Sequence, residues 1–78
     1  MGSRMKITVK LFAVLKIGRF REKEVYYPVG SNVGDVVNDL GLPAEHVDIL
    51  LVNGSHVDRG YQLQDGDILS LLPMVEGG

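Results

Sequence analysis

Few residues of this 78-residue chain could carry chemistry, and the most distinctive are the last two, Gly77 and Gly78. The chain has no cysteine, which excludes disulfides, thiolate metal ligands and a thiol nucleophile. His46 and His56 stand in loop-like contexts without partners at ligand spacing, so surface histidines are expected rather than a metal site. No phosphate-binding glycine loop, nucleophile elbow or paired-histidine motif occurs. With no nucleophile beside a general base, the chain is not expected to be an enzyme.

Charge and composition exclude further classes of function. A net charge of −2 argues against non-specific nucleic-acid binding, which needs Lys and Arg to displace counterions from phosphates. No apolar run approaches the roughly 18 residues of a membrane span. No apolar signal region opens the sequence, so a cytoplasmic location is expected, with neither membrane nor nucleic acid as a partner. A chain this short has room for a single core and little surface for a deep catalytic cleft.

One domain is expected over residues 5–78. Met5 opens the first strand pattern, and the four residues before it, Met1 to Arg4, are interpreted as a cloning remnant outside the fold.

A hairpin is predicted at the start of this domain. Ile7, Val9 and Leu11 alternate with polar residues, which is the period of a half-buried strand. Phe12 falls on the opposite face from that apolar row. A basic connection over 16–21, with Gly18 as its turn residue, leads to a second strand over 24–27 that ends near Pro28. Tyr26 and Tyr27 fall on opposite faces of that strand, so one is expected to pack and the other to be exposed.

The only convincing helix pattern follows. Its apolar stripe recurs at i, i+3, i+4 and i+7 and consists of Val33, Val36, Val37 and Leu40. Either Ser31 or Asn32 can cap its first amides, and Asp35 lies in the first turn, where the helix dipole favours an anion. Gly41 suits the position after the helix, and Pro43 prevents its continuation.

The second half reads as strands again. Residues 49–52 are apolar on both faces and precede Asn53-Gly54, a strong signal for a two-residue hairpin turn. Val57 is then expected on a short return strand. Asp65-Gly66 is a second turn signal, before a last strand over 68–72. The order predicts an α+β domain of the β-grasp (ubiquitin-like) type, with one helix packed across a mixed sheet of four to five strands.

Two surfaces follow from these periodicities. The helix stripe is expected to form one core with Ile7, Val9, Leu69 and Leu71. Phe12, Leu72 and either Leu50 or Leu51 then occupy positions that the helix cannot cover, and a contiguous exposed apolar patch usually marks a partner site. The alternative is that Phe12 folds back under the loop over 16–21.

The end of the chain resembles a known family. Leu63-Gln64-Asp65-Gly66-Asp67, an apolar strand, Pro73, Val75 and a closing Gly77-Gly78 together resemble the MoaD and ThiS sulfur carriers, MoaD most closely. The opening strand, Met5 to Ala13, and the turn Val52-Asn53-Gly54 extend the likeness upstream. Met74 stands where MoaD proteins often carry a second proline, and the segment 41–47 is shorter than in a typical MoaD. These departures bear on the pathway more than on the carrier role.

The resemblance implies a cycle at the chain end. An ATP-dependent, E1-like activating enzyme of the MoeB or ThiF kind would adenylate the Gly78 carboxylate, and sulfur would replace the adenylate to leave a thiocarboxylate. The acceptor implied is the large subunit of molybdopterin synthase, or another sulfur-accepting enzyme. Gly77 suits threading into a narrow site because it has no Cβ. Pro73, Met74 and Val75, with Phe12 and Leu72, would contact the partner. No cofactor or metal is expected on the chain itself, and ATP is used by the partner.

Other functions fit the same sequence. Gly78 could instead form an isopeptide as a ubiquitin-like modifier, or carry sulfur for thiamine or another metabolite. A plain β-grasp interaction module would not use its terminus at all. The basic cluster Lys16, Arg19, Arg21 and Lys23 reads as a solvated face, with an acidic partner as the alternative.

Overall fold

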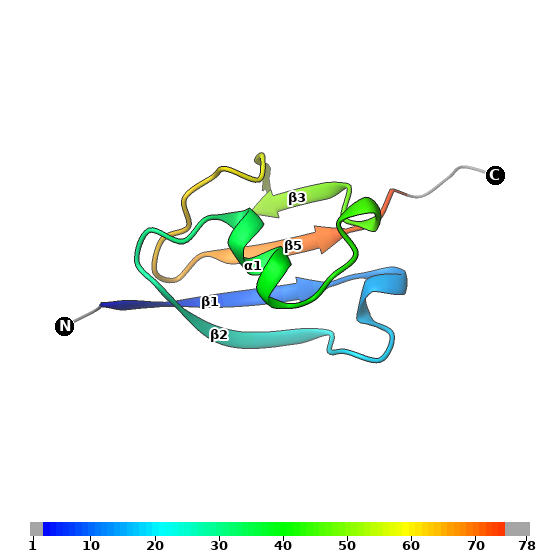
Figure 1. Cartoon of the computed structure of the whole chain (residues 1–78), viewed down its shortest axis with the longest axis horizontal. Coiled ribbons are helices and arrows are strands. Elements are labelled where there is room, and N and C mark those ends of the chain that lie inside the picture. Colours follow the sequence, from blue (N-terminus) through cyan, green and yellow to red (C-terminus); the bar gives the residue numbers. More distant parts are fainter. Residues whose placement is uncertain (1–2, 75–78) are drawn as a thin grey trace.

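Alternating apolar residues build a sheet with one buried face, as the strand periods predict. The structure is a computed structural model that describes residues 3–74. Its elements in chain order, with η for a 3₁₀ helix, are β1 (Arg4–Leu11), η1 (Ala13–Lys16), β2 (Glu22–Pro28), α1 (Val33–Asp39), η2 (Ala44–His46), β3 (Ile49–Val52), β4 (Ser55–His56) and β5 (Ile68–Leu72). The strand order is β2-β1-β5-β3-β4, with β1 and β5 parallel and the other pairs antiparallel (Figure 1). The predicted β-grasp fold, one helix across a mixed sheet, is confirmed.

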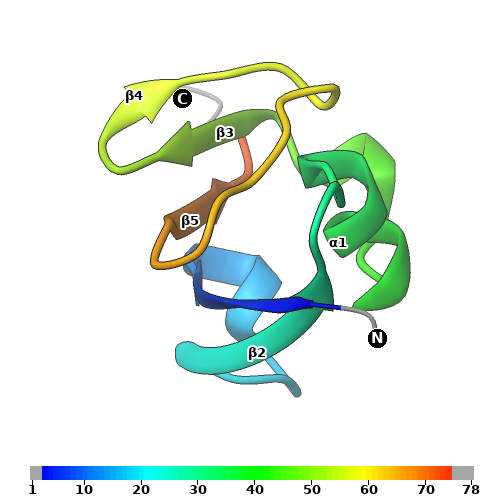
Figure 2. The same ribbon diagram turned by 90° about the vertical axis from the view of Figure 1, so that its left-hand side faces the viewer.

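The helix and the sheet share one core. Figure 2 shows α1 lying against one face of the sheet, so that this helix leaves the opposite face uncovered. Val33, Val36 and Val37 are buried on the helix, and the predicted strand partners Ile7, Val9, Leu69 and Leu71 are fully buried beneath them. Leu40 is half-buried and packs against the same cluster. The predicted core is therefore confirmed, and it is joined by Leu15, Leu42, Val47 and Leu63 from the connections.

Local side-chain hydrogen bonds begin the short helix. Asn32, rather than Ser31, is the N-cap: its Oδ1 accepts from the Asp35 amide at 2.8 Å, and the Asp35 carboxylate accepts from the Asn32 amide at 2.9 Å. This reciprocal capping box satisfies two amides that the first turn leaves unpaired. Gly41 follows the helix with a φ of 68°, a left-handed conformation that glycine adopts without strain.

A buried carboxylate joins two of the predicted turns. Asp67 is 8 % exposed and accepts from Asn53 Nδ2 at 3.0 Å and from the Gln64 amide at 2.8 Å. Asn53 itself has a φ of 52°, as a tight hairpin turn requires, and its Oδ1 accepts from the Ile68 amide. The Asp65–Asp67 segment is thus a structural turn that fixes where β5 begins.

The structure corrects several expectations. β1 begins at Arg4, which pairs with Pro28, so this residue belongs to the sheet rather than outside the fold. The return strand β4 is Ser55–His56 and stops before Val57, although the Val57 amide still donates to the Leu50 carbonyl. The expectation that both histidines lie in loops was wrong, because His46 ends η2 and His56 lies in β4. Both are exposed, as expected for surface histidines.

Candidate functional site

The C-terminal tail leaves the sheet beside the end of β1. Because β1 and β5 are parallel, Leu11 and Leu71 are paired, and the chain continues from both strands at the same edge of the sheet (Figure 1). We call this edge the tail end. The β1–β2 connection, which contains η1, lies at the tail end together with Pro73 and Met74.

Asp48 fixes the direction in which the tail starts. Its Oδ2 accepts from the Met74 amide at 2.9 Å, and its own amide donates to the Leu72 carbonyl at 3.1 Å. Pro73 between these contacts has a restricted φ and no amide hydrogen to satisfy. Sequence reasoning missed Asp48, because only the register of β3 against β5 shows that a residue before Ile49 lies beside Met74.

Of the tail residues predicted to take part in the site, only Pro73 and Met74 lie among the residues that the structure describes. Pro73 is half-buried, and Met74 is 62 % exposed. Val75, Gly77 and Gly78 lie outside the described residues, so their predicted roles stay predictions.

The sheet face opposite α1, here called the open face, brings the predicted partner residues together. Phe12 is 40 % exposed, so the loop over 16–21 does not bury it. Leu72 is half-buried on the same face. Of the two leucines left open by the sequence, Leu51 belongs to the open face, whereas Leu50 is buried against the helix.

A row of apolar side chains crosses the open face at the tail end. Leu72 pairs with Ile49, and the Phe12 amide donates to the Leu71 carbonyl, so Phe12, Leu72 and Ile49 follow one another across three neighbouring segments. Ile68, 38 % exposed, lies further back along β5. Ile49 and Ile68 were not predicted as site residues, and their alternation with Leu50 and Leu69 was the signal that could have found them.

The open face becomes polar toward β2. Lys6 and Glu24 form an exposed ion pair at 3.9 Å, the kind of pair that contributes little to stability. Tyr26 is 60 % exposed there, while Tyr27 packs on the covered face, as predicted. Burial, and then the hydrogen bond and negative charge of Asp39, raise the pKa of Tyr27 well above that of an ordinary tyrosine. Tyr27 therefore stays neutral and holds β2 to α1 rather than acting as an acid or base.

The described residues present an apolar surface beside the start of the tail. Between Ser3 and Met74, no group of three or more His, Cys, Asp or Glu side chains converges to hold a metal ion. Within the same range, no helix is long and apolar enough to cross a membrane. The arrangement can hold a partner against the apolar row while the tail starts in a fixed direction from its edge.

The fold and this surface define a ubiquitin-like protein of the β-grasp class. The chain belongs to the Mut7-C ubiquitin family, whose model matches residues 6–77. This membership confirms the resemblance to MoaD-like, ubiquitin-like proteins.

Solved structures from archaea share the fold over nearly the whole chain. The Haloferax volcanii HVO 2177 protein is 26 % identical, with a TM-score of 0.78 over 96 % of this chain and 88 % of that one. A putative molybdopterin converting factor, subunit 1, from Pyrococcus furiosus is 28 % identical, with a TM-score of 0.74 over 91 % of this chain and 99 % of that one. SAMP1 from Haloferax volcanii is 27 % identical, with a TM-score of 0.72 over 94 % and 99 %.

Proposed function

We propose that this chain is a sulfur carrier and not itself a catalyst, with the Gly78 carboxylate as its working group. The observation that carries the proposal is the tail end: a chain closing in Gly77-Gly78 leaves the sheet from an exposed apolar row, with its start held by Asp48. Membership of the Mut7-C ubiquitin family supports it, as does the likeness to a putative molybdopterin converting factor subunit.

A partner enzyme has to load the sulfur, which takes two steps. A carboxylate is a poor electrophile, so one of its oxygens first attacks the α-phosphorus of ATP and releases pyrophosphate. Sulfur at the oxidation level of hydrosulfide then attacks the acyl-adenylate carbonyl and displaces AMP, which leaves the Gly78 thiocarboxylate. In a third step the thiocarboxylate sulfur attacks an electrophilic carbon of the acceptor's substrate and displaces a leaving group. Water then cleaves the acyl–sulfur bond, which leaves the sulfur on the substrate and restores the Gly78 carboxylate. The carrier contributes position: an apolar face for docking, and two terminal glycines without Cβ atoms, which fit a narrow site.

The proposed partners are an E1-like activating enzyme of the MoeB or ThiF kind and a sulfur-accepting enzyme. The proposed acceptor is the large subunit of molybdopterin synthase, by likeness to the Pyrococcus furiosus protein. The proposed place of action is the cytoplasm, where ATP is available. No cofactor is proposed on the carrier itself.

Removal of Gly78 tests this proposal. The deletion variant should neither be adenylated nor gain sulfur when it is incubated with the activating enzyme, ATP and a sulfur donor, as read by intact mass. Its thermal unfolding should match that of the wild type, because a terminal glycine contributes no side chain to the core. Gly77→Ala should load more slowly, since an added methyl group obstructs a narrow site. A deletion variant that supported full sulfur transfer would remove the proposal.

A second candidate is a protein modifier. SAMP1, the small archaeal modifier protein 1 of Haloferax volcanii, has the same fold at 27 % identity. In this case the activated Gly78 would pass to a lysine amine and form an isopeptide. Conjugates of higher mass in cells, lost when Gly78 is deleted, would support this second function.

A further inference from the structure

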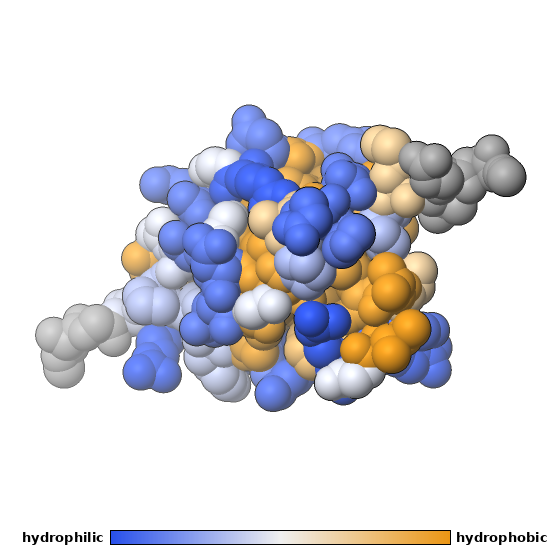
Figure 3. Space-filling view, turned by 45° about the vertical axis from the view of Figure 1, so that its right-hand side comes forward, coloured by the Kyte–Doolittle hydropathy of each residue, from blue (hydrophilic) through white to orange (hydrophobic). Residues whose placement is uncertain are grey.

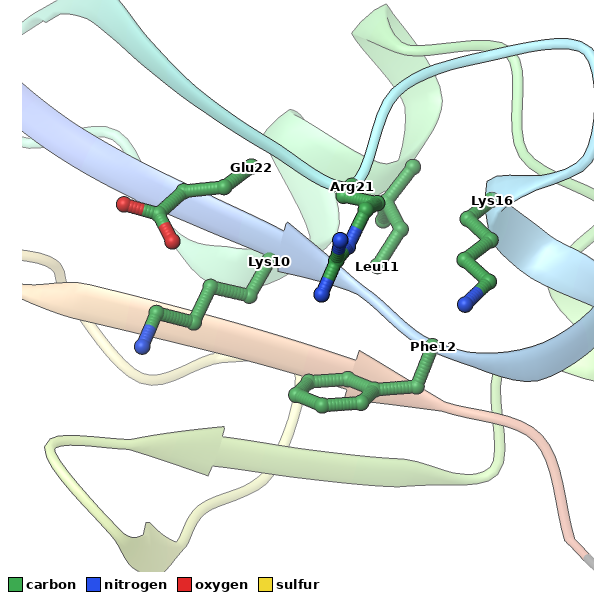
Figure 4. Close-up of a pocket in the computed structure, with 6 residues that line it drawn as sticks. All are labelled: Lys10, Leu11, Phe12, Lys16, Arg21 and Glu22. Carbon is green, nitrogen blue, oxygen red and sulfur yellow. The ribbon is translucent and has the colours of Figure 1, made fainter.

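A pocket of about 560 Å³ opens at the tail end, between β1 and the β1–β2 connection. Figure 4 shows the side chains that line it: Lys10, Leu11, Phe12, Lys16, Arg21 and Glu22. In this view the Arg21 guanidinium lies between Lys10 and Phe12, the Lys16 ammonium points toward the same space, and the Glu22 carboxylate points away from Arg21. Arg21 and Lys16 thus face the part of the pocket that Phe12 lines, while the Lys10 ammonium extends toward the other side, to which Glu22 also points.

This basic pocket is not the basic cluster that the sequence suggests. Lys23 pairs with Val9 on the helix side of the sheet, and its Nζ lies 5.8 Å from the centre of the Phe20 ring. Arg19 Nη1 donates to the Leu15 carbonyl at 3.3 Å. Lys10, eleven residues before Arg21 in the sequence, takes their place. The fold thus sorts the cations, and only some of them face the open side.

Among the described residues, none of the cations that line the pocket forms a close ion pair. Over residues 3–74, Lys6 and Glu24 form the one ion pair within 4.0 Å, so none of Lys10, Lys16 and Arg21 has a carboxylate partner there. Glu22 lines the pocket without pairing with any of them. The whole chain has a net charge of −2, so its overall composition does not predict this local cluster of positive charge.

The β1–β2 connection, which carries Lys16, also exposes large apolar side chains. Val14 is 54 % exposed and Ile17 is 68 % exposed, both in the β1–β2 connection, and Phe12 lines the pocket itself. Figure 3 shows apolar surface gathered at this end of the molecule, near the β1–β2 connection. A nucleic acid would require a longer row of cations to neutralise its phosphates. Here Glu22 and Glu24, two residues apart on β2, place negative charge on the open face next to the pocket. Cations flanked by apolar side chains instead match a protein segment that carries both carboxylates and apolar residues.

We propose that the basic pocket receives an acidic segment of the activating enzyme, with one carboxylate between Lys16 and Arg21, a second toward Lys10, and an apolar side chain against Phe12. This inference rests on the proposed function, because it names the enzyme that takes up the tail. Charges at the rim of an interface mainly speed association and select the partner, and salt screens them. The pocket would thus guide the tail end toward the enzyme before the glycines enter its active site.

Charge reversal with a matched control tests the pocket. Lys16→Glu and Arg21→Glu should each raise the KM of the activating enzyme for the carrier about fivefold at roughly 20 mM salt, with kcat within about twofold. At roughly 0.5 M salt, where charges are screened within a few ångströms, the KM of each variant should equal that of the wild type. Lys23→Glu makes the same charge change on the other face of the sheet and should leave KM near the wild-type value.

The outcomes separate this inference from the proposed function. If the wild-type chain is loaded and all three variants share its KM and salt dependence, the pocket has no docking role, while the carrier function stands. If Lys23→Glu raises KM as much as Lys16→Glu does, overall charge explains the effect and the pocket is again refuted. If the wild-type chain is never loaded, the proposed function fails, and this inference fails with it. Circular dichroism of each variant checks that these exposed substitutions leave the fold unchanged.

Discussion

The two faces of the sheet use alternate residues of the same strands, yet they differ sharply in burial. On the covered face, Ile7, Val9, Leu69 and Leu71 have almost no exposed surface. On the open face, Phe12, which directly follows β1, is 40 % exposed and Ile68 in β5 is 38 % exposed, although both are large and apolar. The helix accounts for the difference, because α1 lies on one side only (Figure 2).

This contrast separates stability from recognition. Each strand contributes one set of side chains to the core and the alternate set to a surface that can dock a partner. Substitutions on the covered face should therefore cost stability, and substitutions on the open face should cost partner binding. The variants below test this separation, from the largest expected loss of stability to the smallest.

Val36→Asp should have the largest effect. Val36 is fully buried on α1, and a carboxylate there would have no partner. The penalty should approach the whole stability of so small a domain, which is roughly 5 kcal/mol. Thermal unfolding followed by circular dichroism should lose its cooperative transition. A transition near that of the wild type would contradict the assignment of the covered face.

Asp67→Ala should cost about 2 kcal/mol of stability. The substitution leaves the Asn53 side-chain amide and the Gln64 backbone amide without their acceptor. Asp65→Ala, in the same turn but exposed, removes one acceptor from the Lys6 amide and should cost less than half as much. Urea unfolding measures both, and equal losses would show that burial of Asp67 is unimportant.

Tyr27→Phe should cost about 1 kcal/mol near neutral pH, because it removes the 3.0 Å hydrogen bond to Asp39. The pKa of Tyr27 is raised in the folded chain, so the unfolded chain loses this proton first, near pH 10. The contribution of Tyr27 is therefore complete below about pH 10 and declines as the pH rises further. Urea unfolding near neutral pH and above about pH 10 measures the free energy of unfolding of both proteins. The wild type should be more stable than Tyr27→Phe at the lower pH, and this difference should shrink at the higher pH. Tyr26→Phe, on the open face, should show neither effect, and an alkaline loss there would point to a general effect of pH.

Phe12→Ala should change stability by no more than about 1 kcal/mol and yet weaken binding of the activating enzyme about tenfold. Phe12 is exposed at the tail end, where the partner is proposed to dock. Val29→Ala is the control, since Val29 is 65 % exposed beside Ser3 at the other end of the sheet. Isothermal titration calorimetry with the enzyme measures both variants. Equal affinity for Phe12→Ala and the wild type would remove the open face from the docking site.

The covered face could be predicted from the sequence because its signals are local. The alternation in β1 and the stripe from Val33 to Leu40 each lie within eight residues, and Asn53-Gly54 marks its turn alone. Asn32 and Asp35 needed only each other to form the cap. These elements agree with the tertiary fold, so local preference was sufficient.

The site was less predictable because it depends on register between distant segments. Asp48 meets Met74 across 26 positions of sequence, and no motif announces this contact. Lys10 joins Lys16 and Arg21 only after β1 and β2 pair, while Lys23 turns to the other face. η1 was missed as well: it has four residues, too few for a helical period, and it is held by burial of Leu15 rather than by propensity.

The most direct test of the carrier role compares the wild-type chain with a chain extended by one residue after Gly78. In the proposed cycle the activating site receives the carboxylate at the end of the chain, so an added residue displaces the reactive group from that site without altering the covered face. Both chains are incubated with the activating enzyme, ATP and a sulfur donor, and their intact masses are measured. The wild-type mass should rise by the difference between sulfur and oxygen, and the extended chain should stay unchanged. Equal loading of both chains would contradict the central claim that Gly78 carries the sulfur.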